Sequence, residues 1–257
     1  MTKVKYLKSF RKMYNSLKKT LKKLLPKRFI FNNEPFFRSL HGILYLGNKH
    51  QCGVCKKKLR RFIELPNKDL LCPFCGSLAR NRRLWNILTT ENYLKGRILH
   101  FSPSRNIYRK LKKRSDITYV TSDYEDEFIA DHQFDITHID QEKATFDTII
   151  CFHVLEHIPD DRKAIKELYR VAKPNANVLI QTPFKDGEIY ENDQIITPED
   201  RLKHFGQEDH VRVYSPEGLK TRLKQAGFTV KSLYFTPKSD DAYFGYASPE
   251  IVLIATK

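Results

Sequence analysis

Long hydrophobic runs are missing from this sequence, and cysteine is scarce. The longest apolar stretches span only a few residues, such as 251–255, far short of the ~20 residues that a membrane-spanning helix needs. Five cysteines in 257 residues do not make a small disulfide scaffold. Because 40% of the residues are hydrophobic and 12% are aromatic, the chain can bury a sizeable core, which excludes wholesale disorder. We expect one large domain, or one domain with a small module.

Acidic residues are absent from residues 1–33, which contain 11 Lys and Arg. The formal net charge is +16, but residues 34–257 hold 35 basic and 30 acidic residues, a net charge of +5. The basicity therefore belongs mainly to an N-terminal arm. This distribution weakens the idea of a nucleic-acid surface that covers the whole protein.

The arm, residues 1–33, has the apolar rhythm of an amphipathic helix that ends at Pro26. Its apolar residues recur at steps of three and four on one helical stripe: Leu7, Phe10, Tyr14, Leu17, Leu21 and Leu24. No uninterrupted apolar core follows the charges, so the arm is not a secretory signal peptide, and a mitochondrial transit peptide would favour Arg and Ser over Lys. Three interpretations stay open: a helix on an anionic membrane surface, a helix that contacts RNA phosphates, and a helix that packs on the body or on another copy of itself.

Four of the five cysteines form two Cys-x-x-Cys pairs within residues 48–80. Sixteen residues separate the first pair, Cys52 and Cys55, from the second, Cys72 and Cys75. Two such pairs fit a tetrahedral Zn²⁺ site, and four thiolates leave no open coordination position, so we predict a structural zinc ribbon. Basic residues between 56 and 61 would offset the negative charge of the thiolates. Two redox-active or incidental pairs are the alternative. Reduced, zinc-bound cysteines favour a cytoplasmic location.

From about residue 96, short apolar runs alternate with helical periodicity. We expect strands at 97–101, 117–121, 146–151, 178–181, 228–235 and 250–256. We expect helices around 107–113, at 160–173 with Asp160 as N-cap, and from Ser215 to Gly227. This alternation predicts an α/β fold with a parallel sheet covered on both faces, whose ligands lie beyond the carboxyl ends of the strands. That rule directs attention to residues 102–104, to Asp123, to residues 151–157 and to the loop after Gln181.

The loop after the first of these strands lacks the glycines of a pyrophosphate-binding site. Residues 101–104 read Phe-Ser-Pro-Ser where a dinucleotide site would have G-x-G-x-x-G, which argues against a dinucleotide dehydrogenase. Asp123 ends the next strand about 20 residues later, where a carboxylate can accept hydrogen bonds from ribose hydroxyls. A nucleoside-type cofactor without phosphates fits both features, and S-adenosylmethionine (SAM) is the candidate.

Residues 149–174 contain IICFHVLEHIPD and AIKELYRVAKP, which resemble the segment after the fourth strand of class I SAM-dependent methyltransferases. The turn at 135–137 resembles the acidic turn on their adenine side, and residues 223–228 resemble the motif before their sixth strand. The resemblance covers about residues 84–257 and implies a Rossmann-like sheet of seven strands. Residues 72–80 and 205–214 resemble a subgroup with a zinc ribbon in front.

The resemblance also implies a set of residues around SAM: Phe101, Ser102, Pro103, Asp123, Asp135, Ile136, Cys151, Phe152 and His153. Asp123 would bind the ribose hydroxyls, and Asp135 or the neighbouring backbone would contact the adenine amine. Two departures from the family pattern stand out. The first-strand loop lacks the usual glycines, and residues 175–177 read Asn-Ala-Asn where Gly-Gly is common, although Asn tolerates a left-handed turn.

Histidines are the candidate catalytic residues. In methyl transfer from a sulfonium, the protein mainly aligns the acceptor and removes a proton from an acceptor hydroxyl. A pKa near neutrality suits His153 and His210 to this task, whereas His157 is more typical of a local helix-start residue. Some related quinone O-methyltransferases hold a divalent cation through residues that match Glu156 and His157, but His153 stands where their other acid would be.

The polar stretch 205–214 supplies candidate acceptor-binding residues: Asp209, His210 and Arg212. Such a density of ionisable groups indicates acceptor recognition, with Arg212 suited to an anionic acceptor. A surface salt-bridge cluster is the alternative interpretation. Cys151 is more typical of a small core residue than of a nucleophile.

We therefore expect a SAM-dependent methyltransferase that acts on an O or N atom of a small-molecule, glycan or lipid-linked acceptor. We expect it in the cytoplasm or at the inner face of a membrane, which residues 1–28 would contact. A second hypothesis is an RNA methyltransferase that uses the ribbon and arm for phosphate contacts, although the body is only mildly basic. A third is a non-catalytic binding or scaffold protein on a degenerate methyltransferase fold, which the missing loop glycines suggest.

Overall fold

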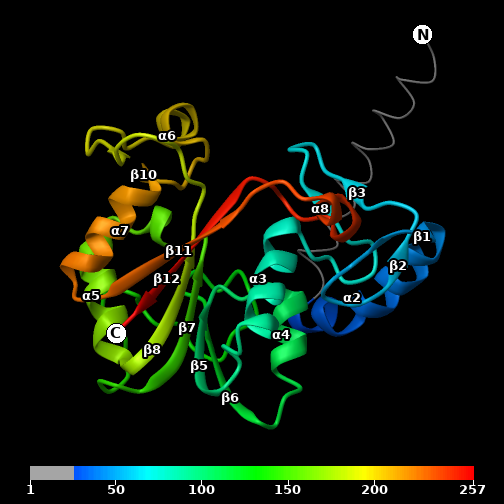
Figure 1. The fold of residues 1–257 in the computed structure, drawn as a ribbon, viewed down its shortest axis with the longest axis horizontal. Helices are drawn as coiled ribbons and strands as arrows, with labels where there is room; N and C mark the ends of the chain where they lie inside the picture. The colour runs from blue at the N-terminus through cyan, green and yellow to red at the C-terminus, as the bar shows by residue number, and fades with distance from the viewer. Residues whose placement is uncertain (1–25) are drawn as a thin grey trace.

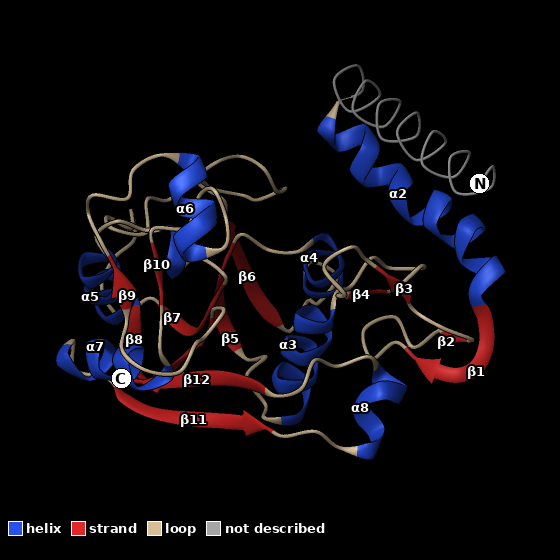
Figure 2. Ribbon diagram, turned by 90° about the horizontal axis from the view of Figure 1, so that it is seen from above, coloured by secondary structure: helices blue, strands red, loops and turns tan. Residues whose placement is uncertain are grey.

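The computed structural model describes residues 26–257, so the predicted amphipathic stripe from Leu7 to Leu24 lies outside the described residues. The centre of the fold is a six-stranded sheet in the order β11-β12-β8-β7-β5-β6 (Figures 1 and 2). Its strands are β5 (Gly96–Phe101), β6 (Ile117–Ser122), β7 (Phe146–Phe152), β8 (Ala172–Gln181), β11 (Thr229–Phe235) and β12 (Glu250–Thr256). Each corresponds to one of the six expected strands, which confirms the α/β, Rossmann-like fold.

The sheet differs from the expectation in two respects. Within residues 26–257 it has six strands, one fewer than the resemblance implies. The segment beside β6 pairs with it through a single parallel bridge, between Ser122 and His132. A bridge between Asp135 and His138 then reverses the chain, so the segment is too short to form a seventh strand at this edge. The sheet is also mixed, because β12 pairs antiparallel with both β8 and β11, whereas β6, β5, β7 and β8 are parallel.

Local sequence signals determine where the helices on one face of the sheet begin. The Asp160 carboxylate accepts the Lys163 N–H (3.0 Å) and begins α5 (Asp161–Val171). The Ser215 hydroxyl accepts the Gly218 N–H (3.2 Å) and begins α7 (Pro216–Gln225). Both predicted N-caps are therefore confirmed. Asn175 has a φ of +63°, which is the left-handed turn expected where Gly-Gly is common.

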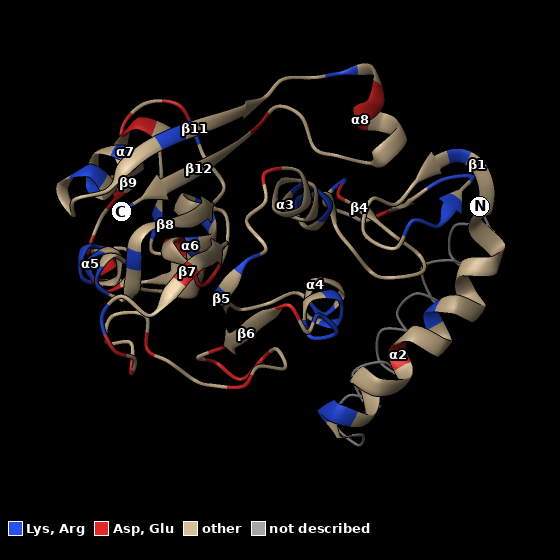
Figure 3. Cartoon of the chain, turned by 60° about the horizontal axis from the view of Figure 1, so that its bottom comes forward, with Lys and Arg blue, Asp and Glu red and all other residues tan. Residues whose placement is uncertain are grey.

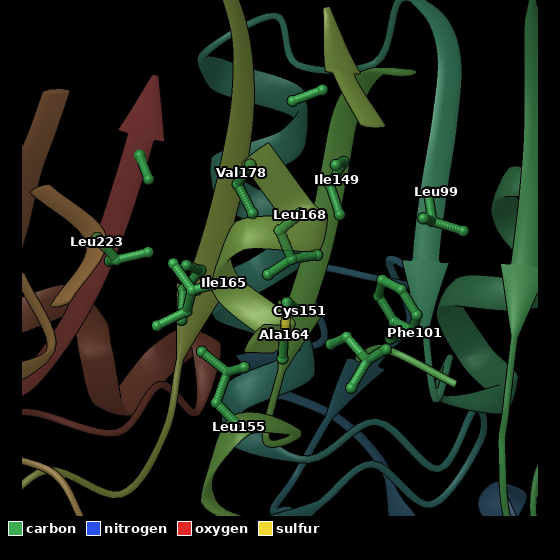
Figure 4. Close-up of a cluster of buried hydrophobic side chains, with 14 of the residues drawn as sticks. Leu99, Phe101, Ile149, Cys151, Leu155, Ala164, Ile165, Leu168, Val178 and Leu223 are labelled. Carbon is green, nitrogen blue, oxygen red and sulfur yellow. The ribbon is translucent and has the colours of Figure 1, made fainter. Parts of the chain in front are cut away.

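Apolar side chains cover both faces of the sheet, which explains why its strands are apolar at consecutive positions. One core lies under α5 and α7 (Figure 4), and its labelled members include Leu99, Ile149, Val178 and Leu223. The other core lies under α3 (Ala79–Thr90) and α4 (Arg105–Leu111) and includes their alternating neighbours Ile98, Ile150 and Leu179. Leu59, Phe62, Cys52 and Cys72 of the cysteine module belong to this second core. The module therefore shares its core with the sheet.

The remaining elements are short except for α2 (Lys27–Gly42), which passes beyond residue 33, the predicted end of the arm. The others are η1 (Ile43–Tyr45), β1 (Leu46–Gln51), β2 (Lys58–Leu59), β3 (Ile63–Glu64), β4 (Leu70–Leu71), η2 (Leu155–His157), β9 (Tyr190–Glu191), α6 (Pro198–Phe205), β10 (Arg212–Val213) and α8 (Ser239–Phe244). Every helix within residues 26–257 is too short or too polar to span a bilayer.

A proline inside α2 is compensated by a contact with α4. Pro35 has no N–H to donate to the Phe31 carbonyl four residues earlier. Arg109 of α4 donates to that carbonyl instead (2.5 Å), and the same guanidinium contacts the Glu34 carboxylate (2.9 Å). This bond fastens α2 to the sheet domain.

Candidate active site

The candidate cofactor residues lie along one edge of the sheet, where β5, β6 and β7 end. Phe101 of β5 is opposite Ser122 of β6, and the Ser102 N–H donates to the Ser122 carbonyl (2.7 Å). Asp123 directly follows β6, and His153 directly follows β7. The structure thus brings together three strand ends to which the sequence pointed separately.

Two residues at this edge have left-handed backbone conformations. The φ of Ser102 is +46° and that of His153 is +55°. Such conformations cost on the order of 1–3 kcal/mol in residues other than glycine and tend to cluster at functional sites. Ser102 stands in the loop that lacks the expected glycines, so this loop keeps a glycine-like turn without a glycine.

Asp123 is held rigidly at the end of β6. It is 4% exposed, its Oδ2 accepts the Phe128 N–H (2.9 Å), and its own N–H donates to the His132 carbonyl (3.0 Å). Carboxylate oxygens accept about four hydrogen bonds in total, so the bond from Phe128 leaves capacity for ribose hydroxyls.

Several predicted cofactor residues are apolar and buried: Phe101, Pro103, Ile136, Cys151 and Phe152. Figure 4 shows Phe101 and Cys151 among the apolar side chains of the core under α5. Burial raises the pKa of the Cys151 thiol, which keeps it neutral and agrees with a small core residue. These residues shape the edge and offer no polar side chain of their own to a cofactor.

Asp135 is exposed, and its carboxylate caps its own turn. The Oδ1 atom accepts the Thr137 N–H (2.7 Å) and the Thr137 hydroxyl (2.8 Å). These hydrogen bonds lower the pKa of Asp135. Because Oδ2 keeps its acceptor capacity, both this carboxylate and the backbone of the turn are candidates for the adenine contact.

A cluster of histidines and carboxylates lies beyond β7. His153 Nδ1 is 3.2 Å from Glu156 Oε1, and His157 Nδ1 is 3.1 Å from Asp209 Oδ2. The His157 and His210 rings meet edge to face with centroids 4.7 Å apart. Both candidate catalytic histidines therefore belong to one cluster, although they are 57 positions apart in the chain.

Several buried polar atoms in this cluster have no hydrogen-bond partner of normal geometry within residues 26–257: both Glu156 carboxylate oxygens, His153 Nε2 and His210 Nε2. Burial alone would raise the pKa of Glu156, but the neighbouring His153 outweighs it and the pKa is lowered. Burial lowers the pKa of His210, which favours the neutral form of this imidazole. A neutral imidazole with an unpartnered ring nitrogen can accept a proton.

The same cluster fits a cation. Glu156, His157 and His210 each place a ligand atom within 4.8 Å of the other two. The unpartnered carboxylate oxygens and ring nitrogen are donors that divalent metals accept. Glu156 and His157 match the cation site of some quinone O-methyltransferases. His210 lies beside them as a third candidate ligand, which the sequence did not suggest.

Arg212 does not fit its predicted role as an anchor for an anionic acceptor. It is 5% exposed, and its three nitrogens all donate to the protein itself: to the Glu191 carboxylate (2.8 Å) and to the carbonyls of Leu155 (3.3 Å), Ile158 and Pro159 (2.7 Å). We therefore reassign Arg212 to holding the segment 206–214 against η2. Asp209 remains exposed beside His157.

A cavity of about 980 Å³ opens between the sheet edge and the cysteine module. His153, residues 181–186, Glu250 and Ile251 line it from the sheet, and residues 67–70, Ala79, Arg80 and 246–249 line it from the other side. His153 Nε2, Gln181 Oε1 and Thr182 Oγ1 are buried atoms without a partner in the described chain. A pocket with a few convergent polar groups is typical of a small-molecule site. The sequence directed attention to the loop after Gln181 but missed the opposite wall.

The four module cysteines come together as predicted. Cys52 and Cys75 have Sγ atoms 3.7 Å apart, as do Cys55 and Cys72. Sulfurs placed tetrahedrally at about 2.3 Å from Zn²⁺ are separated by about 3.8 Å, so this donor set fits zinc. The two pairs also share one backbone form, because the residue after each pair, Lys56 or Gly76, is left-handed and donates its N–H back to Cys52 or Cys72.

Arg82, which was not predicted from the sequence, holds the cysteine module in place. The basic residues at 56–61 are exposed, whereas Arg82 is fully buried. Its guanidinium donates to the Ser77, Leu70 and Gly245 carbonyls at 2.6, 2.9 and 3.1 Å. The Ser77 hydroxyl in turn lies 3.3 Å from Cys52 Sγ. The signal in the sequence was a group of three arginines, 80, 82 and 83, within the first five residues of α3.

Residues 75–233 match the family described as "Methyltransferase domain". The chain belongs to this family. The match begins at the last module cysteine and ends in β11, so it takes in all the predicted cofactor residues. The predicted family, SAM-dependent methyltransferases, is thereby confirmed.

Curated relatives are similar over part of their length. The chain is 35% identical over 91 residues to a ubiquinone biosynthesis O-methyltransferase of Pseudoalteromonas translucida, covering 35% of this chain and 38% of that protein. It is 25% identical over 140 residues to the Vibrio parahaemolyticus protein of the same name, covering 52% and 54%. The chain thus matches about half or less of each relative.

Solved structures share the fold at low sequence identity. A SAM-dependent methyltransferase from Archaeoglobus fulgidus has a TM-score of 0.50 at 17% identity, covering 71% of this chain and 95% of that one. One from Mesorhizobium loti has a TM-score of 0.50 at 12% identity, covering 67% and 97%. These likenesses extend to the fold alone.

Proposed function

We propose that this chain is a SAM-dependent methyltransferase that transfers a methyl group to an O or N atom of a small-molecule, glycan or lipid-linked acceptor. The position of His153 carries the proposal. This residue directly follows β7, at the edge of the sheet where Ser102 and Asp123 lie, and it also lines the 980 Å³ cavity. A donor at that edge and an acceptor in the cavity would meet beside it.

The donor would lie across the ends of β5, β6 and β7. When bound, SAM supplies a methyl group on a positively charged sulfur, which is already a good leaving group. The Asp123 carboxylate would bind the ribose hydroxyls, Asp135 or the neighbouring backbone the adenine amine, and the backbone around Ser102 the methionine end. Ile136 and Phe152 would give these contacts an apolar floor.

His153 is the better placed of the two candidate bases. Its Nε2 lacks a protein partner and its Nδ1 faces Glu156, so the carboxylate would hold the ring and stabilise it once protonated. His210 is absent from the cavity lining and contacts His157 instead, which suits it to positioning the cluster. Should the cluster bind a divalent cation, Glu156, His157 and His210 would hold it.

A small molecule is the acceptor class with the most support. The relatives' names denote O-methyltransferases of ubiquinone biosynthesis, and the cavity is closed on two sides as a small-molecule pocket is. The walls hold as many carboxylates as cations, so the charge of the lining favours an acceptor of neither sign: Lys68, Arg80 and Lys185 against Asp69, Asp186 and Glu250. An RNA acceptor has less support, because residues 62–257 hold 28 basic and 29 acidic residues.

The cysteine module would hold one structural Zn²⁺ through Cys52, Cys55, Cys72 and Cys75. Four sulfur donors complete a tetrahedron, so the metal would have no position for a substrate. Its role would be to fix one wall of the cavity. We also propose a cytoplasmic protein whose residues 1–28 contact the inner face of a membrane, since this segment is basic and its apolar residues share one stripe.

Titration of SAM into the full chain tests the proposal. Isothermal titration calorimetry should detect binding, and Asp123→Ala should weaken it by about 1–3 kcal/mol because the ribose hydrogen bonds are lost. Glu125→Ala, which removes an exposed carboxylate two positions away, is the matched control and should bind as the wild type does. No heat of binding at millimolar SAM would favour a scaffold protein, and an unchanged Asp123→Ala would remove Asp123 from the site.

A further inference from the structure

One face of α2 and η1 carries large apolar side chains that are 50–68% exposed: Phe29, Phe36, Phe37, Leu40, Ile43 and Leu44. Their spacing of 7, 1, 3, 3 and 1 residues places them within one stripe of a helix. Leu46, 51% exposed, continues the stripe at the start of β1. We call these seven residues the α2 face. Exposed apolar patches of this extent mark interaction sites.

The opposite side of α2 is already occupied. The Phe31 ring packs edge-on against Tyr108, with centroids 5.7 Å apart, and the Arg109 guanidinium lies 4.0 Å from the Phe31 ring centroid. Glu34 pairs with Arg109 at 2.9 Å and with Arg38 at 2.7 Å. Because these contacts fasten the helix by its inner side, the α2 face cannot turn toward the sheet domain.

The surroundings of the α2 face are basic. Residues 26–61 contain nine Lys and Arg and one acidic residue, Glu34, whose carboxylate is turned to the inner side. Figure 3 shows Lys and Arg along α2, β1 and β2, while acidic residues mark the segments near β6 and α8. Exposed Arg60 and Arg61 lie 5.8 and 5.7 Å from the Tyr45 ring centroid, at the end of the face. The apolar stripe is therefore flanked by cations.

We propose that the α2 face docks on a lipid bilayer with anionic headgroups. Its apolar side chains enter the boundary between headgroups and acyl chains, and the flanking Lys and Arg contact the headgroups. A protein partner fits less well, because lysine is depleted from protein interfaces and abundant here. This surface extends the membrane contact proposed for residues 1–28 into the folded part of the chain. It does not depend on methyl transfer.

Co-sedimentation of the full chain with lipid vesicles tests the docking surface. We expect binding to vesicles of phosphatidylcholine with about 30% phosphatidylglycerol, and much weaker binding to phosphatidylcholine alone. The triple variant Phe36→Ser, Phe37→Ser, Leu40→Ser should bind the anionic vesicles at least about tenfold more weakly. The matched control Ile196→Ser, Leu202→Ser, Tyr234→Ser removes equally exposed apolar groups from the sheet domain and should bind as the wild type does.

Three outcomes overturn the proposal. Wild-type protein that does not prefer anionic vesicles would remove the membrane as partner. A triple variant that binds like the wild type would assign the binding to residues 1–25 alone. A triple variant that loses a dimer in light scattering but keeps vesicle binding would make the face a contact between copies. Circular dichroism and thermal unfolding of each variant report whether the fold is intact without relying on SAM binding, so failure here is distinct from failure of the proposed catalysis.

Discussion

Residues 1–61 and residues 62–257 differ in their balance of basic and acidic residues. The first part holds 18 Lys and Arg against one acidic residue, and the second holds 28 against 29. In the second part, several arginines are buried and paired with carboxylates, as in Arg83 with Glu250 at 3.1 Å and Arg212 with Glu191 at 2.8 Å. In the first part, Lys56, Lys57 and Lys58 are exposed. The net charge of this protein therefore arises from residues 1–61 and says little about the candidate catalytic edge.

The apolar side chains of the central sheet and those of α2 also differ in their exposure. The sheet encloses its apolar groups in two cores, whereas α2 leaves a row of them in solvent. The cysteine module joins the two parts, since Cys52 and Cys55 belong to the first and Cys72 and Cys75 to the second. Substitutions in the module and at paired and unpaired charges therefore test whether the two parts differ in these ways.

Replacing a module cysteine should have the largest effect. We expect Cys72→Ser to reduce bound zinc from about one per chain to almost none, because it removes one of the four thiolate ligands. Structural zinc is worth on the order of 10 kcal/mol or more in small zinc domains, so its loss should also destabilise the module. The module shares Leu59 and Phe62 with the core under α3, so the melting temperature of the whole chain should fall as well. Metal analysis and thermal unfolding measure both effects.

Cys151→Ala is the matched control for this experiment. It removes the fifth, buried cysteine from the other core and should leave the zinc content unchanged. A Cys72→Ser protein with no metal and the wild-type melting temperature would show that the module is not held by zinc and that the two parts fold separately.

A buried paired charge should matter far more than an exposed one. We expect Arg212→Ala to destabilise the fold by about 1–3 kcal/mol, because it leaves the carbonyls of Leu155 and Pro159 without their donor, whereas Glu191 keeps its pairing with Arg222. Arg60→Ala, at an exposed position, should change the free energy of unfolding by less than about 0.5 kcal/mol. Denaturant titration compares them. Equal effects would abolish the distinction between the two regions.

Acid should lower the free energy of unfolding through a group in the central sheet, and this should be the smallest of the predicted effects. Complete burial lowers the pKa of His100 to about 3, and its Nδ1 lies 2.9 Å from the Tyr119 hydroxyl. As the pH falls below about 6.5, the unfolded chain binds this proton first, so stability is full above that value and declines toward pH 3. Between pH 7.5 and 5.5 the loss is about 1 kcal/mol.

Denaturant midpoints at those two pH values measure the loss. His100→Gln should flatten the dependence, whereas substitution of the exposed His41 by Gln should leave it as in the wild type. A His100→Gln protein with the wild-type pH dependence would place the acid-sensitive group elsewhere.

Local signals made much of the fold predictable. Alternation and apolar runs located all six strands, and Asp160 and Ser215 marked helix starts because a cap acts within three residues of itself. The cysteine geometry was predictable because two short turns determine it. The strand count was overestimated, since only the tertiary fold reveals the chain reversal between Asp135 and His138.

Contacts between distant segments were beyond the sequence. The Arg109 bond to the Phe31 carbonyl joins positions 78 apart, and Arg82 reaches Gly245 across 163 positions. The role of Arg212 was misassigned for the same reason, because an arginine in a polar loop looks free until its partners at Leu155 and Pro159 are known. The cavity needed two walls that only the folded chain brings together.

A crystal structure of the full chain with S-adenosylhomocysteine would show where the cofactor binds. We expect the ribose hydroxyls on the Asp123 carboxylate, the amino-acid end against the backbone at Ser102, and the sulfur directed toward the cavity beside His153. A nucleoside bound at another surface, or an edge closed by its own side chains when the ligand is saturating, would contradict this expectation.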